Sequence, residues 1–182
     1  MHICSLIMKI ITLQTFVLSV AILLLVIGYT TSTKSENQNE TDTEFNMYTG
    51  MFDFSDAGKR STLFGFEHQD EKLFRNTFLG KLSPITGGFI TNAGATYLYT
   101  GVQAEYELGR LNFTPSLTPG YYDPGNGKDL GHALEFKSEI QLSFEVFEDS
   151  NLGMSYNHIS NASLGKDNPG ANSYMFNFLQ KF

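Results

Sequence analysis

The feature that most constrains the fold is a long alternation of apolar and polar residues between Leu134 and Phe147. The apolar members share one parity and the polar members share the other: Leu134, Phe136, Ile140, Leu142, Phe144 and Val146 against Glu135, Lys137, Glu139, Gln141, Ser143 and Glu145. Successive side chains of a β-strand point to opposite sides, so this stretch predicts a strand with an apolar face and a charged face. A period of two over this length fits no helix.

Less regular stretches of the same kind predict further strands at Phe45–Phe54, Thr62–His68, Phe78–Thr91, Ala95–Leu108, Leu111–Tyr122, Asn151–Ser160 and Ser173–Phe182. A composition with 16 Phe, 9 Tyr, 17 Gly and only 5 Pro suits many strands joined by tight turns. The apolar face could meet a second sheet in a soluble sandwich, or lipid in an outer-membrane barrel whose charged face lines the lumen. The sequence therefore predicts an all-β fold, an antiparallel up-and-down transmembrane β-barrel of about eight strands, with the sandwich as the alternative.

The connections between the predicted strands favour the barrel. Gly109-Arg110 and Glu148-Asp149-Ser150 are short, as periplasmic turns should be, whereas the links at 123–131 and 161–172 are long and rich in Gly, Asn and Asp, as outward loops should be. Two connections do not fit: the link at 68–77 is longer than this rule expects for a periplasmic turn, and the link between the strands 78–91 and 95–108 is shorter than an outward loop should be. These connection lengths predict that the strand 151–160 runs from the periplasmic side toward the outer side of the membrane.

The two ends of the chain fit secretion to the outer membrane. Lys9 precedes an apolar run from Ile10 to Tyr29, which predicts a signal peptide over 1–30, with an uncleaved anchor as the alternative. Residues 31–44 are mostly Thr, Ser, Asn, Glu and Asp and are expected to form a disordered linker before a barrel over 45–182. The final residue, Phe182, resembles the terminal aromatic by which outer-membrane barrels are recognised for insertion. We expect a multi-pass barrel in the outer membrane of a Gram-negative bacterium.

Charge and motifs exclude several function classes. The formal net charge is −7 and no run of Lys or Arg occurs, so we expect no nucleic-acid partner. The only cysteine, Cys4, lies in the leader, which excludes disulfides and thiolate metal sites in the barrel. The four histidines do not pair at metal-ligand spacing, and no phosphate-binding Gly loop or GxSxG motif occurs. We expect no metal and no other cofactor.

The candidate chemistry lies at the end of the strand 151–160. His158 and Ser160 are two residues apart and therefore project from the same face of a strand. An imidazole beside a hydroxyl is what nucleophilic acyl transfer requires, since the base takes the serine proton as the oxygen attacks a carbonyl carbon. The amides of Asn161 and Asn168 could stabilise the resulting oxyanion. The same parity carries Leu152, Met154 and Tyr156, so the pair is predicted on the lipid-facing side; alternatively, the strand leaves the membrane at Tyr156 and the pair is simply wet.

The motif resembles that of the outer-membrane lipid A 3-O-deacylase family. The residues that carry the resemblance are His158, Ile159, Ser160, Asn161, Ala162, Asn168, Gly170, Ser173 and Tyr174. The resemblance implies a serine esterase that removes an acyl chain, at the 3-position, from lipid A of lipopolysaccharide in the outer leaflet. It implies Ser160 as nucleophile, His158 as general base and Asn161 as oxyanion donor, with Asn168 as a second donor. The implied partners are lipid A and outer-membrane lipids; a homodimer is left open.

One position departs from the family pattern. The catalytic acid of the family falls twelve residues after the serine, where this chain has Asn172. An asparagine carbonyl can orient the imidazole, as in Cys-His-Asn enzymes, but carries no charge to stabilise imidazolium. Asp167, in the same loop, is a candidate substitute acid. Two other hypotheses follow: an esterase acting at another acyl position or on phospholipid, and a structural barrel that is catalytically weak or inactive.

Overall fold

The computed structural model describes residues 43–70, 73–77 and 80–182. The predicted signal peptide and residues 31–42 of the predicted linker lie outside the described residues. The strands are β1 (Thr43–Phe52), β2 (Ser61–Asp70), β3 (Arg75–Thr77), β4 (Gly80–Thr91), β5 (Thr96–Ala104), β6 (Tyr106–Leu108), β7 (Leu111–Asp123), β8 (Leu134–Phe147), β9 (Ser150–Ser160) and β10 (Ala171–Lys181). The described part of the chain contains no helix long and apolar enough to cross a membrane.

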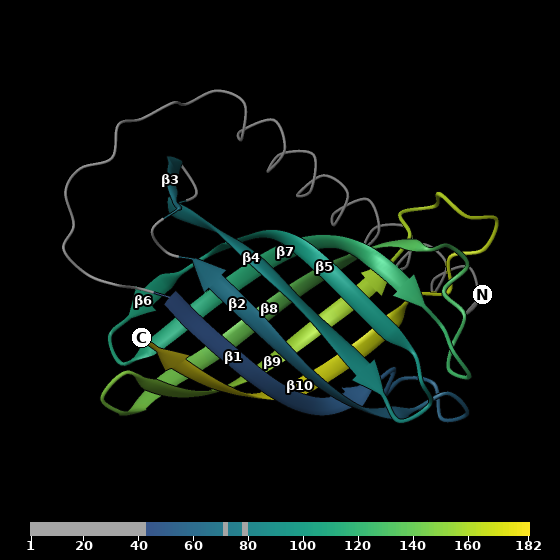
Figure 1. Ribbon diagram of the computed structural model, residues 1–182, viewed down its shortest axis with the longest axis horizontal. Helices are drawn as coiled ribbons and strands as arrows, with labels where there is room; N and C mark the ends of the chain where they lie inside the picture. Colours follow the sequence, from purple (N-terminus) through teal and green to yellow (C-terminus); the bar gives the residue numbers. More distant parts are fainter. Residues whose placement is uncertain (1–42, 71–72, 78–79) are drawn as a thin grey trace, which may run out of the picture. The chain divides into compact units, whose positions relative to one another are not determined.

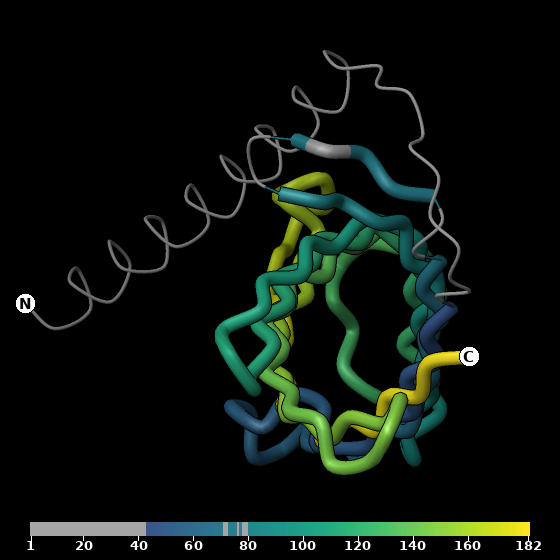
Figure 2. Tube along the Cα trace, turned by 90° about the vertical axis from the view of Figure 1, so that its left-hand side faces the viewer, coloured from purple at the N-terminus to yellow at the C-terminus, as the bar shows by residue number. Residues whose placement is uncertain are grey.

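The strands form a closed antiparallel barrel with eight positions around the ring, as predicted. Neighbours along the chain pair with each other, and β1 pairs with β10, so that the first and last strands close the ring (Figure 1). β5 and β6 both pair with β7 and together occupy one position in the ring, and the short β3 pairs with β4. Figure 2, turned by 90° from Figure 1, shows the strands running around a ring.

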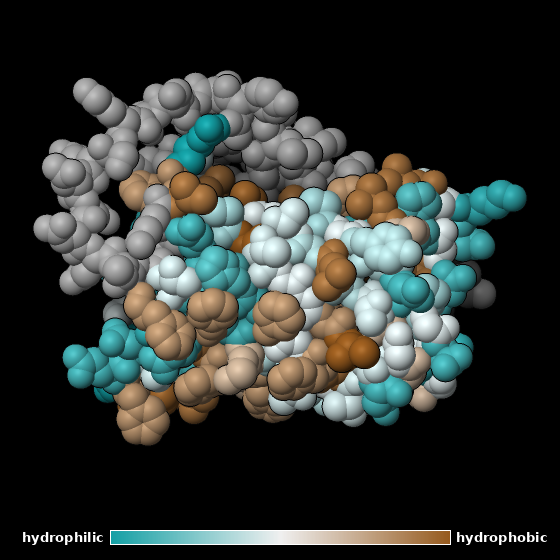
Figure 3. Space-filling model, viewed as in Figure 1, coloured by the Kyte–Doolittle hydropathy of each residue, from teal (hydrophilic) through white to brown (hydrophobic). Residues whose placement is uncertain are grey.

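Each strand presents one face to the outside and one to the lumen. On β8 the outward Ile140 and Phe144 are both 50 % exposed, whereas the inward Glu135 and Lys137 are 0 % and 1 % exposed. The alternation in the sequence thus marks the two sides of the barrel wall, with the apolar side outward. On the face shown in Figure 3, apolar side chains lie over the strands, and hydrophilic ones gather toward both ends of the strands.

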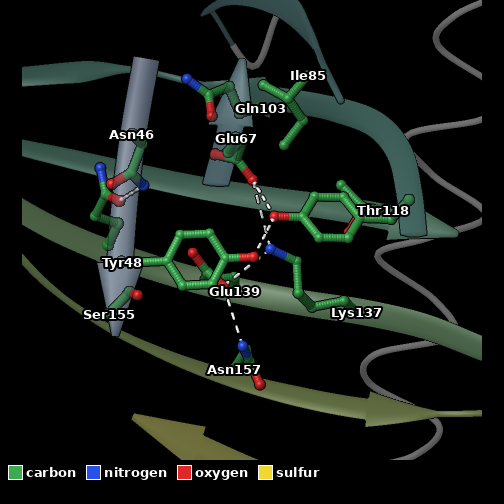
Figure 4. Close-up of polar contacts among 12 residues, drawn as sticks. Asn46, Tyr48, Glu67, Ile85, Gln103, Thr118, Lys137, Glu139, Ser155 and Asn157 are labelled. Atoms are coloured by element: carbon green, nitrogen blue, oxygen red, sulfur yellow. Dashed lines mark hydrogen bonds and ion pairs between the residues drawn. The ribbon is translucent and has the colours of Figure 1, made fainter. Parts of the chain in front are cut away.

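The lumen contains a polar network (Figure 4) as well as a buried cluster of aromatic and aliphatic side chains that includes Phe52, Phe89 and Tyr97. The Lys137 ammonium lies 3.1 Å from a Glu139 carboxylate oxygen and 3.6 Å from one of Glu67. It also lies 4.1 Å from the centre of the Tyr99 ring, whose hydroxyl donates to Glu67 at 2.8 Å. Asn157 on β9 donates to Glu139 at 3.2 Å. Paired charges therefore tie strands from around the barrel together and hold β9 from its inner side.

Strand boundaries differ from the predicted ones where pairing overrides the local pattern. β1 begins at Thr43, inside the expected linker, because Glu44 pairs with Gln69 on one side and with Lys181 on the other. The single strand predicted over 95–108 is interrupted at Glu105 and divides into β5 and β6. The predicted link 68–77 contains the end of β2 and the whole of β3.

Three of the longer connections share one end of the barrel: β1–β2 (53–60), β7–β8 (124–133) and β9–β10 (161–170). The opposite end has the tight turns at 109–110 and 148–149 and the connection between β2 and β4 that contains β3. β9 runs toward the end with the long loops, at the right of Figure 1, and stops at Ser160. The candidate residues therefore lie where this strand meets its loop.

Candidate active site

His158 and Ser160 belong to the outer face of β9. On this strand Met154 and Tyr156 are 56 % and 47 % exposed, whereas Ile159 is fully buried on the opposite, inward side. His158 and Ser160 continue the outward parity and lie roughly 6.5 Å apart along the strand. Ser160 is only 8 % exposed. The two side chains thus share one side of the wall, where the alternation places them.

Strand register places Asn172 directly opposite His158. β9 and β10 are antiparallel, with His158 paired with Asn172 and Tyr156 with Tyr174. The Asn172 Oδ1 atom lies 2.9 Å from His158 Nδ1. An amide oxygen can only accept, so Nδ1 carries the hydrogen of this bond. In a neutral imidazole the other nitrogen, Nε2, is then unprotonated and can accept a hydrogen bond.

Two further groups hold the Asn172 amide. The Tyr156 hydroxyl donates to the same Oδ1 atom at 2.9 Å, and Asn172 Nδ2 donates to Ser55 Oγ at 3.2 Å. Sequence reasoning missed both contacts. Tyr156 could have been found, because it shares the parity of His158. Ser55 could not, since it lies in the β1–β2 loop, 117 residues from Asn172.

Asn161 organises the loop that follows Ser160. Its Nδ2 atom donates to the carbonyl oxygens of Leu130 and Asp167, both at 2.8 Å, and its Oδ1 atom accepts from the Ser163 backbone at 3.0 Å. These bonds tie the β9–β10 loop to the β7–β8 loop. Because both hydrogens of the amide are engaged, the Asn161 side chain is a poor candidate for the oxyanion donor that the resemblance implied.

Asn168 has the free donor that an oxyanion site needs. Its Oδ1 atom accepts from the Asn161 backbone N–H at 3.0 Å, which fixes the orientation of the amide. Its Nδ2 atom is buried and has no hydrogen-bond partner among the described residues. A buried unpaired donor costs free energy unless something is there to accept from it. Of the two amides, only that of Asn168 has an Nδ2 atom without a partner among the described residues.

The remaining members of the motif shape the site. Gly170 has a φ of +61°, and a Cβ there would lie 2.9 Å from His158 Cε1, so the loop can pass this close to the imidazole only with glycine. Asp167, the candidate substitute acid, is exposed and contributes its backbone oxygen to Asn161. The partner of His158 Nδ1 is Asn172.

Comparison with known proteins places this site in a family. The family model described as lipid A 3-O-deacylase (PagL) matches residues 27–179, which is most of the chain. The chain belongs to the lipid A 3-O-deacylase family. It is thus a member of a family of ester hydrolases that act on lipid A. No curated protein matches the chain in sequence.

Solved structures agree with the barrel fold. The crystal structure of the outer membrane enzyme PagL is 18 % identical, with a TM-score of 0.58, and the match covers 76 % of this chain and 99 % of that one. A de novo designed transmembrane β-barrel is 11 % identical, with a TM-score of 0.53, over 81 % of this chain and all of that one. The predictions of a transmembrane barrel, of the outer membrane and of the deacylase family are confirmed. The roles of individual residues stay predictions.

Proposed function

We propose that the chain hydrolyses the 3-position acyl ester of lipid A through Ser160. His158 Nε2 takes the Ser160 hydroxyl proton as Oγ bonds to the ester carbonyl carbon. Asn168 Nδ2 donates to the oxyanion that forms. The bond between the acyl carbon and the sugar oxygen breaks, and His158 returns the proton to this departing oxygen. Water then attacks the acyl-serine with His158 again as base, releasing a free fatty acid and restoring Ser160.

The observation that carries the proposal is the bond between His158 and Asn172 on the outer side of the wall. It fixes the tautomer that leaves Nε2 ready to accept a proton, and it joins two strands that are in register. An ionisable side chain directed toward lipid is costly and calls for a functional reason. The carbonyl oxygen of Asn172 fills the orienting role that an acid has in the family.

The surroundings of the pair suit an acyl substrate. The Phe54 ring lies 6.2 Å from that of Tyr156 and 5.6 Å from that of Tyr174, so aromatic rings flank the site on its outer face. With the long loops outward, this part of the wall lies at the outer leaflet, where the ester bonds of lipid A are found.

Replacing Ser160 by alanine tests the assignment. Ser160→Ala should abolish deacylation while the barrel still assembles, shown by heat-modifiable migration on gels. Mass spectrometry of lipid A from cells expressing each form measures the loss of one acyl chain. The matched control is Ser138→Ala, since Ser138 on β8 lies directly across from His158 on the same face. Deacylation that persists in Ser160→Ala, or that is lost only in Ser138→Ala, would show that Ser160 is not the nucleophile.

A structural barrel without activity is the second candidate, and the neutral Asn172 is the observation that favours it. In that case lipid A from cells expressing wild type would match that from cells without the protein. Purified protein incubated with lipid A in detergent separates an inactive site from one that is merely slow, because a slow enzyme accumulates free fatty acid over long incubation.

A further inference from the structure

The outward hydrogen bonds of Asn172 continue beyond Ser55 to a buried carboxylate. Ser55 Oγ lies 3.2 Å from Asp53 Oδ1, in the same β1–β2 loop. Asp53 is fully buried, and its other oxygen, Oδ2, lies 2.7 Å from Lys128 Nζ in the β7–β8 loop. A chain of contacts therefore runs from Asp53 through Ser55 and Asn172 to His158.

The direction of every hydrogen bond in this series follows from the carboxylate at its start. A carboxylate only accepts, so the Ser55 hydroxyl gives its one hydrogen to Asp53. The lone pairs of Ser55 Oγ then remain for Asn172, and only the NH₂ side of the amide can meet them. Asn172 Oδ1 is thereby turned toward His158, whose Nδ1 must donate. Each step leaves a single choice for the next.

The orientation of the amide matters because an amide, unlike a carboxylate, has two different ends. A flipped Asn172 would direct NH₂ at His158 Nδ1, which would then have to accept. The hydrogen would move to Nε2, and the imidazole could no longer take the proton of Ser160. An acid at position 172 accepts from the imidazole with either oxygen and needs no such control.

The backbone shows that Asp53 occupies a demanding position. Its φ is +51°, in the left-handed region that Asp and Asn tolerate better than most other residues. There its carboxylate is held between Ser55 and Lys128, two residues that come from different loops.

We propose that Asp53 and Ser55 are positioning residues that set the amide orientation of Asn172 and, through it, the catalytic tautomer of His158. The inference rests on the proposed function, in which His158 is the base. It assigns a role in the reaction to the β1–β2 loop, which lies far from the catalytic motif in sequence. It also explains how this protein can orient His158 with the amide of Asn172, at the position where the family has an acid.

The test compares Ser55→Ala in two backgrounds, wild type and Asn172→Asp, using lipid A in detergent as substrate. In the wild-type background Ser55→Ala should lower kcat about 3- to 10-fold with KM nearly constant, which is the effect of one neutral hydrogen bond on the population of the correct tautomer. In the Asn172→Asp background the loss should shrink to less than about 2-fold, because a carboxylate orients His158 without help. Ser55 is exposed at the surface, so this variant should fold.

Asp53→Asn provides a second variant of the same shape that keeps the tolerance for positive φ. It should show the same dependence on residue 172. Asp56→Asn is the control. Asp56 lies 3.9 Å from Lys128, and its replacement removes the same charge without touching the series of contacts from Asp53 to His158. Equal losses for Ser55→Ala in both backgrounds would show a merely structural role, and no loss in wild type would also overturn the proposal. Activity that persists in Ser160→Ala would contradict the proposed function itself. The comparison of Ser55→Ala in the two backgrounds tests only the positioning role, so the two failures can be told apart.

Discussion

Restoring a charge at position 172 is the most informative single perturbation of this site. Asn172→Asp keeps the size of the side chain and so keeps an oxygen near 2.9 Å from His158 Nδ1. It adds a negative charge beside the imidazolium that forms when Ser160 gives up its proton. The variant should therefore be a faster enzyme than the wild type.

The structure bounds the gain. A hydrogen bond to a charged acceptor exceeds a neutral one by about 1 kcal/mol, which sets a lower limit of about 5-fold in kcat. Two unit charges about 4 Å apart interact by about 4 kcal/mol at an effective dielectric constant of about 20, which sets an upper limit near 10³-fold. The acid-to-amide change in a serine protease costs about 10⁴-fold, partly through a wrong tautomer. Here the bond from His158 Nδ1 already fixes the right tautomer, so the gain should stay below that figure.

The assay is the initial rate of fatty-acid release from lipid A in detergent, with the barrel checked by heat-modifiable migration. Asn126→Asp is a matched control, because Asn126 is exposed in the β7–β8 loop and receives the same charge away from His158. We expect kcat to rise about 10-fold or more for Asn172→Asp and to stay within about 2-fold for the control. An intact Asn172→Asp barrel with unchanged or lower kcat would refute the reasoning that charge beside His158 limits this site.

Four other substitutions test separate parts of the structure. Tyr156→Phe removes a donor to the orienting amide and should lower kcat about 3-fold, measured on the same substrate. Gly170→Ala places a methyl group against His158 and should lower kcat about 10²-fold, while heat-modifiable migration shows the barrel intact. Lys137→Met leaves two lumen carboxylates without their cation and should lower the free energy of unfolding, measured in urea with lipid vesicles, by about 3–5 kcal/mol. Ile140→Arg puts a charge on the lipid face near the middle of β8 and should cost about 2–4 kcal/mol in the same measurement.

The fold and the faces of its strands were predictable because the signal is local. Side chains alternate between the two sides of the wall along a strand, and the apolar and polar residues from Leu134 to Phe147 follow this alternation. The same rule placed His158 and Ser160 on the outside of β9. Strand ends were less predictable: Thr43 and Glu44 join β1 because strands on both sides pair with them, although their own sequence reads as linker.

The assignment of the oxyanion donor shows a second limit. Asn161 and Asn168 are the same residue type in the same loop, and sequence cannot tell which amide is free. The fold distinguishes the two amides, because Asn161 Nδ2 donates to two carbonyl oxygens whereas Asn168 Nδ2 has no partner among the described residues. One of these carbonyl oxygens belongs to Leu130 in another loop, so the difference arises from tertiary contacts.

The sequence by itself determined the barrel, its lipid-facing side and the shared outer face of His158 and Ser160, since side-chain alternation and residue spacing act over a few residues. Only the tertiary structure decided what orients the imidazole. Closure of the ring pairs β1 with β10 and brings Ser55 to Asn172 across 117 residues of chain. Contacts of that kind depend on strand register around the whole barrel, which no local pattern encodes.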